Sequence, residues 1–147
     1  MSEKSSMREG DYFAIPMEDG RSAVSQIIWL GSNSKDQKFK NIFAFSVLSV
    51  GNGRDVIGRS EYLQFEGYRG PFVVLFTAID KLKSREWPTL KSGIIAGGSL
   101  KEFEFNMAGT LYRQGHPVRV LPIEEYQNYL VMAVSGYALV EKFLQQY

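Results

Sequence analysis

Residues 10–31 place two β-strand patterns around one short turn, and no other segment constrains the fold as strongly. Residues 11–17 are rich in aromatic and aliphatic side chains, and residues 22–30 follow with a second strand pattern. The turn between them is Glu18-Asp19-Gly20-Arg21. Because Asp-Gly supplies the positive φ angles of a type I′ turn, the segment predicts a β-hairpin in which Asp19, Gly20 and Arg21 have a structural role.

Several later segments also predict strands. Residues 39–50 are apolar on both alternating faces, which is typical of a central strand covered on both sides. Pro16 predicts that the first strand lies at an edge or bends there, since proline cannot donate to a central ladder. Further strands are expected at 72–79, 101–106, 110–113 and 118–121.

The last quarter of the chain changes to helical spacing. Pro122 suits the first turn of a helix, and Glu124 and Glu125 favour its positive end. Ser135-Gly136 interrupts the pattern, which predicts one kinked helix or two short ones. Strands followed by helix predict one α+β domain over residues 1–147, with residues 1–8 as a frayed tail. We expect a bent antiparallel sheet, or a small SH3-like barrel, on which the C-terminal helix packs.

Composition narrows the function classes. The 17 basic and 16 acidic residues give a net charge of +1, so the basic excess of a typical nucleic-acid binder is missing and such a partner is not expected. There is no cysteine, which excludes disulfides and thiol catalysis. The N-terminus lacks the apolar stretch of a signal peptide, and charged and polar residues interrupt the apolar run 123–140. We therefore expect a cytoplasmic protein without a membrane partner.

The residues of the first hairpin also resemble a known family. Gly10-Asp11, Ala14-Ile15-Pro16, Asp19-Gly20-Arg21 and Ala23 are similar to the pattern of the immunity protein 26 family of bacterial toxin-immunity systems. Trp87, Gly93, Val134 and Gly136 look similar to later parts of that pattern. The resemblance implies a cytoplasmic inhibitor that binds the C-terminal domain of a cognate toxin and blocks its active site or substrate path, without a cofactor.

Five residues are the candidates for such an interface. Glu102 and Glu104 share one face of a predicted strand and could form an acidic patch that plugs a basic active site. Trp87 lies in a polar segment, which predicts an exposed aromatic anchor, whereas Trp29 lies in a strong strand and is expected in the core. The Tyr68-Arg69 loop completes the set.

Two alternatives remain open. An SH3-like module could bind peptides or nucleic acid, with Lys35, Lys38 and Lys40 around Phe39 as the best basic cluster. An enzyme could use His116, the single histidine, as a general base. No nucleophile lies near His116 in the sequence, and no metal-ligand spacing is present, so we expect neither catalysis nor a metal site.

Overall fold

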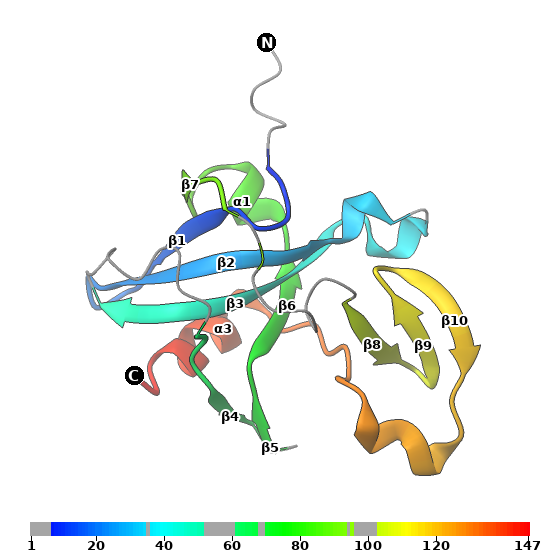
Figure 1. Cartoon of the computed structure of the whole chain (residues 1–147). Helices are drawn as coiled ribbons and strands as arrows, with labels where there is room; N and C mark the ends of the chain where they lie inside the picture. The colour runs from blue at the N-terminus through cyan, green and yellow to red at the C-terminus, as the bar shows by residue number, and fades with distance from the viewer. Residues whose placement is uncertain (1–6, 35, 52–60, 68–69, 94, 96–102) are drawn as a thin grey trace.

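The computed structural model describes residues 7–34, 36–51, 61–67, 70–93, 95 and 103–147. These residues form antiparallel sheets and short helices, which confirms the α+β prediction (Figure 1). The strands are β1 (Tyr12–Pro16), β2 (Ser22–Leu30), β3 (Ile42–Gly51), β4 (Phe65–Gly67), β5 (Gly70–Phe72), β6 (Val74–Ala78), β7 (Thr89–Lys91), β8 (Glu104–Met107), β9 (Thr110–Arg113) and β10 (His116–Val120). The helical segments are α1 (Asp80–Lys83), α3 (Tyr137–Leu144) and the 3-10 turns η2 (Gly31–Asn33), η3 (Gln37–Phe39) and η4 (Ile123–Asn128).

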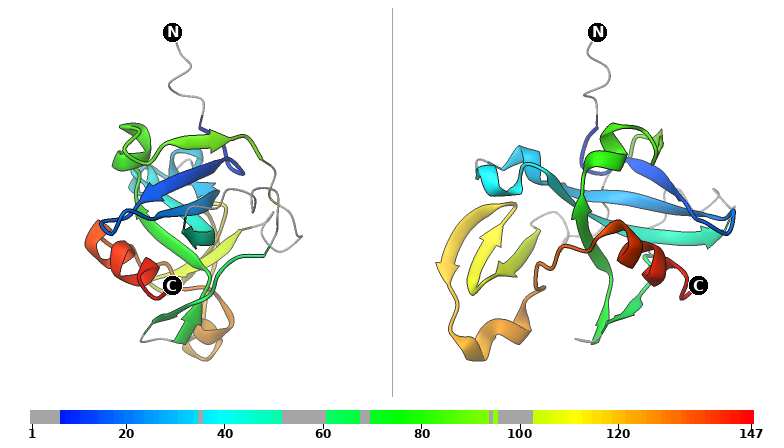
Figure 2. Two further views of the ribbon diagram at one scale, coloured as in Figure 1. Left: turned by 90° about the vertical axis from the view of Figure 1, so that its left-hand side faces the viewer. Right: turned by 180° about the vertical axis from the view of Figure 1, so that it is seen from behind.

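The strands are arranged in one larger and two smaller sheets. The five-stranded sheet has the order β6-β3-β2-β1-β7, the three-stranded sheet has the order β10-β9-β8, and β4 pairs with β5. The larger sheet is open, so the bent-sheet form of the prediction is confirmed and the closed SH3-like barrel is wrong. The two rotated views in Figure 2 show the three-stranded sheet beside the larger one, with α3 near the β4-β5 hairpin.

The first hairpin forms where the sequence predicts it, but with a different turn. The Gly20 N–H donates to the Met17 carbonyl at 3.1 Å, and the Met17 N–H donates to the Arg21 carbonyl at 2.8 Å. Gly20 has a φ of 92°, whereas Asp19 is not among the residues with positive φ. A type I′ turn needs two positive φ angles, so this loop is a three-residue type I turn that ends in a glycine bulge.

β1 is not an edge strand, because β7 pairs with it at Tyr12 and Phe13. Pro16 is the last residue of β1, beyond the paired part of β7. The missing N–H of Pro16 therefore costs the sheet no hydrogen bond on the β7 side.

β3 is the central strand that the sequence predicts. It lies between β2 and β6, with Phe43, Phe45 and Val47 packed into one core cluster. Ala44 and Leu48 alternate with them and pack into clusters on the other face. The strand begins at Ile42 rather than at residue 39, because the preceding residues form η3.

β2 departs from strict alternation. The register between β2 and β3 shifts at two places, one of them between Ile27 and Trp29. As a result Ile28 and Trp29 pack into the same cluster, although they are neighbours in sequence, and Leu30 returns to the cluster of Ile27. The bulge thus turns Trp29 to the opposite face from the one that simple alternation predicts.

Trp87 belongs to the main core, so the prediction of an exposed anchor is wrong. Its side chain is 5 % exposed, with its ring centroid 6.0 Å from that of Phe13 and 5.3 Å from that of Tyr137. The polar sequence around it is misleading: the chain turns at Arg85, which has a left-handed φ of 68°, and the Trp87 N–H donates to the Lys81 carbonyl at 3.0 Å. Val140 and Leu144 of α3 close the same core, which confirms that the C-terminal helix packs on the sheet.

A second aromatic cluster joins the two larger sheets. Trp29 is buried as predicted, and its ring lies 5.5 Å from Phe39, 6.4 Å from Phe76 and 5.2 Å from Phe105 between ring centroids. Tyr112 stacks on Phe105 at 5.5 Å. Phe103 is also buried, so both aromatic residues that alternate with Glu104 in this segment point into the core.

The hairpins of the three-stranded sheet have the two-residue turns that were expected elsewhere. Ala108 and Gly109 connect β8 to β9 with φ angles of 53° and 90°. Gln114 and Gly115 connect β9 to β10 with φ angles of 53° and 85°, so β10 begins at His116 and not at residue 118. Two positive φ angles in a two-residue loop are the signature of a type I′ turn.

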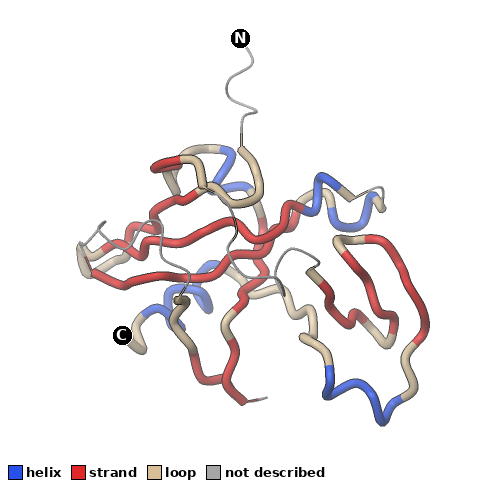
Figure 3. The backbone as a smooth tube through the Cα atoms, in the orientation of Figure 1, coloured by secondary structure: helices blue, strands red, loops and turns tan. Residues whose placement is uncertain are grey.

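The C-terminal quarter is less helical than its spacing predicts. The turn that follows Pro122 is the 3-10 segment η4, and α3 begins only at Tyr137 (Figure 3). Residues 129–136 between them run as an extended strap that bridges to Asn106 at Val131 and to Phe76 at Val134. In the part of the chain that the structure describes, no helix has the length and apolar character that a membrane span needs.

Candidate functional site

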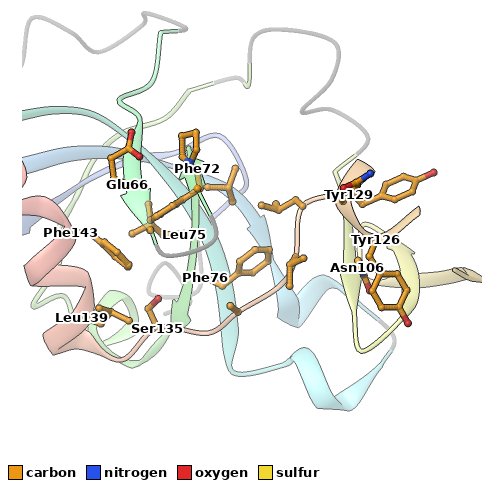
Figure 4. Close-up of a pocket in the computed structure, with 18 of the residues that line it drawn as sticks. Glu66, Phe72, Leu75, Phe76, Asn106, Tyr126, Tyr129, Ser135, Leu139 and Phe143 are labelled. Atoms are coloured by element: carbon orange, nitrogen blue, oxygen red, sulfur yellow. The ribbon is translucent and has the colours of Figure 1, made fainter. Parts of the chain in front are cut away.

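A cleft of about 1120 Å³ opens between the five-stranded sheet and the three-stranded sheet (Figure 4). Its floor is β6, one wall is the β4-β5 hairpin with α3, and the other wall is the corner of β8 with η4 and the start of the strap. Clefts of this size with mostly apolar linings are typical of binding sites.

The hairpin wall is held by the end of α3. The Gln146 amide forms two hydrogen bonds with the backbone of Glu66: it accepts from the N–H at 2.9 Å and donates to the carbonyl at 3.0 Å. Phe72 packs edge-on against Phe143 with ring centroids 4.9 Å apart. Leu139, 43 % exposed, adds an apolar side chain on the same side. This wall is therefore a fixed unit with an apolar surface.

The opposite wall is organised by Asn106, which is buried although the alternating pattern predicts an exposed side chain. Its backbone N–H donates to the Leu130 carbonyl at 2.7 Å, and its carbonyl accepts from the Met132 N–H at 2.9 Å. Its side-chain oxygen accepts from the Gly109 N–H at 2.9 Å. Gly109 in turn leaves room for the ring of Tyr126, because a Cβ there would lie 2.5 Å from the Tyr126 hydroxyl.

The floor joins the two walls through the strap. The Ser135 N–H donates to the Phe76 carbonyl at 2.8 Å, and the Thr77 hydroxyl donates to the Ser135 carbonyl at 2.7 Å. Leu75 and Phe76 themselves line the cleft. The strap is thus bonded to both sheets, and it fixes the distance between the walls.

The chemistry of the cleft favours binding. Among the described residues that line it, Glu66 alone carries a formal charge, and aliphatic and aromatic side chains predominate. Tyr126 and Tyr129 supply hydroxyl groups at one wall, and the Tyr129 hydroxyl accepts from the Arg119 guanidinium at 3.3 Å. Apolar surface with a few polar groups at its margin gives affinity by desolvation and orientation by hydrogen bonds.

Of the five predicted interface residues, the structure describes Glu104 and Trp87. Glu104 is paired with Arg113, whose guanidinium lies 2.6 Å from the carboxylate, so its charge is already neutralised. Trp87 is in the core. Glu102, Tyr68 and Arg69 lie outside the described residues. An acidic plug built on Glu104 is therefore not favoured.

The residues of the two alternatives lie elsewhere. His116 is an exposed residue of β10, opposite Arg113, and does not line the cleft. The Lys38 ammonium donates to the Tyr112 hydroxyl at 3.0 Å, and this hydrogen bond raises the pKa of the lysine. Lys35 lies outside the described residues. Within the described part of the chain, no three His, Asp or Glu side chains are grouped as metal ligands would be.

Asp19 and Arg21 have the structural role that the sequence predicts. The Arg21 guanidinium lies 2.9 Å from the Asp19 carboxylate, and the Arg21 backbone N–H donates to the same side chain at 3.0 Å. Hydrogen bonds from the Arg21 side chain, and then from its backbone, lower the pKa of Asp19. The pair stabilises the turn and is remote in sequence from every residue that lines the cleft.

The sequence prediction missed the cleft. The lining residues of β4, β5 and β6 meet those of β8, η4, the strap and α3 only through contacts between distant segments, which no local pattern records. One signal was present: Tyr126, Tyr129 and Leu139 are large apolar side chains in a segment too polar for a core helix. No protein-family model, no curated protein and no solved structure matches this chain.

Proposed function

We propose that this protein is an immunity protein, which binds a cognate bacterial toxin domain in the cytoplasm and blocks its active site or substrate path. The observation that carries the proposal is the preformed apolar cleft of about 1120 Å³. The hairpin residues Gly10 to Ala23 add support, since they resemble the immunity protein 26 family. No step of chemistry is required of the protein, because inhibition follows from steric occupation.

The cleft is better suited to a protein surface than to a nucleic acid. Its one charged lining residue among those described is Glu66, an acid, which repels phosphate. The best-placed lysine of the basic cluster, Lys38, is held by Tyr112 and by Asp36 at 3.5 Å. Association would therefore be driven by burial of apolar area, with polar groups at the rim setting orientation.

The test is co-expression with the toxin domain encoded by the neighbouring upstream gene. We expect growth rescue and a 1:1 complex that survives gel filtration. Random oligonucleotides are the control, and they should show no salt-dependent shift. If the chain neither rescues growth nor co-purifies with that domain, the proposal is overturned.

A further inference from the structure

We infer that the cleft binds its partner as an added strand, in which an extended segment of the partner pairs with the open edge of β6. The inference rests on the proposed function and specifies how the partner is recognised. The occupant is a protein segment with apolar side chains at alternate positions and one lysine or arginine.

The edge of β6 is only partly used by the chain itself. β6 is the outermost strand of its sheet, and β3 pairs with it from Ile42↔Ala78 to Ser46↔Val74. On its other side, Val134 forms a parallel bridge with Phe76. In the described part of the chain, no residue is bridged to Val74 on that side. The strap therefore covers one end of the edge and leaves the other end facing the cleft.

The backbone of Val74 is oriented to accept a strand. The Phe76 carbonyl accepts from Ser135, so the peptide groups of Phe76 face away from β3. Residues two apart in a strand present their N–H and C=O groups to the same side. The N–H and C=O of Val74 thus point toward the cleft, in line with the hydrogen bonds that the strap already makes. A partner strand would continue the pairing that Val134 begins.

The walls fit the side chains of such a segment. Phe72 and Leu139 stand on one side of the floor and Tyr126 and Tyr129 on the other, as Figure 4 shows. An added strand projects successive side chains to opposite sides, so alternate residues would contact the two walls. This arrangement gives affinity through the backbone and selectivity through the walls.

The charge of Glu66 indicates which polar side chain the partner segment carries. Glu66 is exposed at the hairpin wall, and among the charged side chains that the structure describes it alone lines the cleft. Its backbone is held by Gln146, so its position on the wall is fixed. A lysine or arginine of the partner segment is the complementary group.

The outer edge of β10 is a weaker candidate for strand addition. β10 is also outermost in its sheet, but Pro117 lacks an N–H and His116 and Arg119 place polar groups along it. Proline and charge on an edge strand are common protections against pairing. We therefore expect the partner segment to pair with the edge of β6 and not with the edge of β10.

The experiment measures binding of the upstream-encoded toxin domain to two matched variants. Leu139→Asp places an acid in the first turn of α3, inside the cleft, and Ile123→Asp places one in the first turn of η4, where Ile123 is 79 % exposed and lines no part of the cleft. An acid at either position is compatible with its helix end, so both variants should fold. We expect Leu139→Asp to weaken binding at least about tenfold and Ile123→Asp to change it less than about twofold.

A second measurement needs no variant. Amide hydrogen exchange of the wild-type complex should show new protection at Val74 and none at Val118, because only the β6 edge gains a strand.

The variant Glu66→Lys tests the charge of the partner segment. It should weaken binding about tenfold, and unchanged binding would show that no basic residue of the partner faces Glu66. Wild-type affinity in Leu139→Asp, or unchanged exchange at Val74 in a complex that does form, overturns strand addition and leaves the proposed function standing. Failure of the wild-type protein to bind overturns both.

Discussion

The five-stranded and the three-stranded sheets use their strands differently. β2 and β3 have apolar side chains packed on both faces, and Phe43, Phe45 and Ile27 are fully buried. By contrast, all five residues of β10 are exposed, and Val120 is 78 % exposed. The larger sheet thus holds most of the buried core, and the smaller sheet packs against it through Trp29, Phe39 and Phe76. A binding surface can therefore be built on the smaller sheet without destabilising the larger one.

The largest loss of stability is expected at Gly31, which follows β2 of the larger sheet and has no space for a side chain. A Cβ at Gly31 would lie 1.9 Å from the Phe39 carbonyl oxygen and 2.6 Å from that of Ile42. Both atoms are backbone, so η2 must move away from η3 and from the start of β3. We expect Gly31→Ala to lower the free energy of unfolding by about 3 kcal/mol or more in urea denaturation.

Gly136→Ala is the control, because nothing lies within 4 Å of a Cβ there. It should change stability by less than about 1 kcal/mol. If the two variants were equally stable, the tight approach of η2 to η3 and to the start of β3 would be contradicted.

A smaller effect is expected in the smaller sheet. A Cβ at Gly109 would lie 2.5 Å from the Tyr126 hydroxyl, the far end of an exposed side chain that can swing away. We expect Gly109→Ala to cost about 2 kcal/mol, part of it from the left-handed φ of 90°. Tyr126 should become more accessible, which fluorescence quenching in the complex-free protein can measure.

Gly20→Ala isolates the backbone contribution, since Gly20 has nearly the same φ, 92°, and nothing within 4 Å of its Cβ. The difference between the two variants reports the Tyr126 contact alone. Equal losses of stability would mean that Tyr126 does not pack on this turn.

The smallest effects are electrostatic and have opposite signs in the two regions. The pKa of Asp19 is lowered by Arg21, so its contribution to stability is present above pH 3.8 and is lost as pH falls through the folded-state value. The pKa of Lys38 is raised by Tyr112, so its contribution is present below pH 10.5 and is lost as pH rises through the folded-state value. NMR titration should show Arg21→Ala moving Asp19 back toward 3.8 and Tyr112→Phe moving Lys38 back toward 10.5. A shift that survives either substitution would assign it to another group.

Local patterns predicted features of both sheets. The hairpin at Gly20 and the central position of β3 in the larger sheet, and the burial of Phe103 and Phe105 beside the smaller one, follow from residue type and alternation. The side reversal at Trp29 does not, because a bulge depends on the register of two strands and leaves no mark on one of them.

The candidate site was beyond such patterns. The polar neighbours of Trp87 predicted exposure, yet its ring packs against Phe13 and Tyr137, which are distant in sequence. The helical spacing after Pro122 was misleading because Asn106 binds residues 130 and 132 in an extended conformation instead. The cleft exists only because β6, β8 and the strap meet, and these pairings are non-local.

The strap would make the binding of the proposed partner close to rigid. Its hydrogen bonds to Asn106, Phe76 and Thr77 are made before any partner arrives, so association costs little ordering entropy and can proceed close to rigid docking. The bonds at Asn106 and Phe76 involve main-chain atoms, whereas Leu139 and Tyr129 line the cleft with their side chains. Under the proposed function, substitutions at such positions would change which partner is bound, while the main-chain hydrogen bonds keep the width of the cleft.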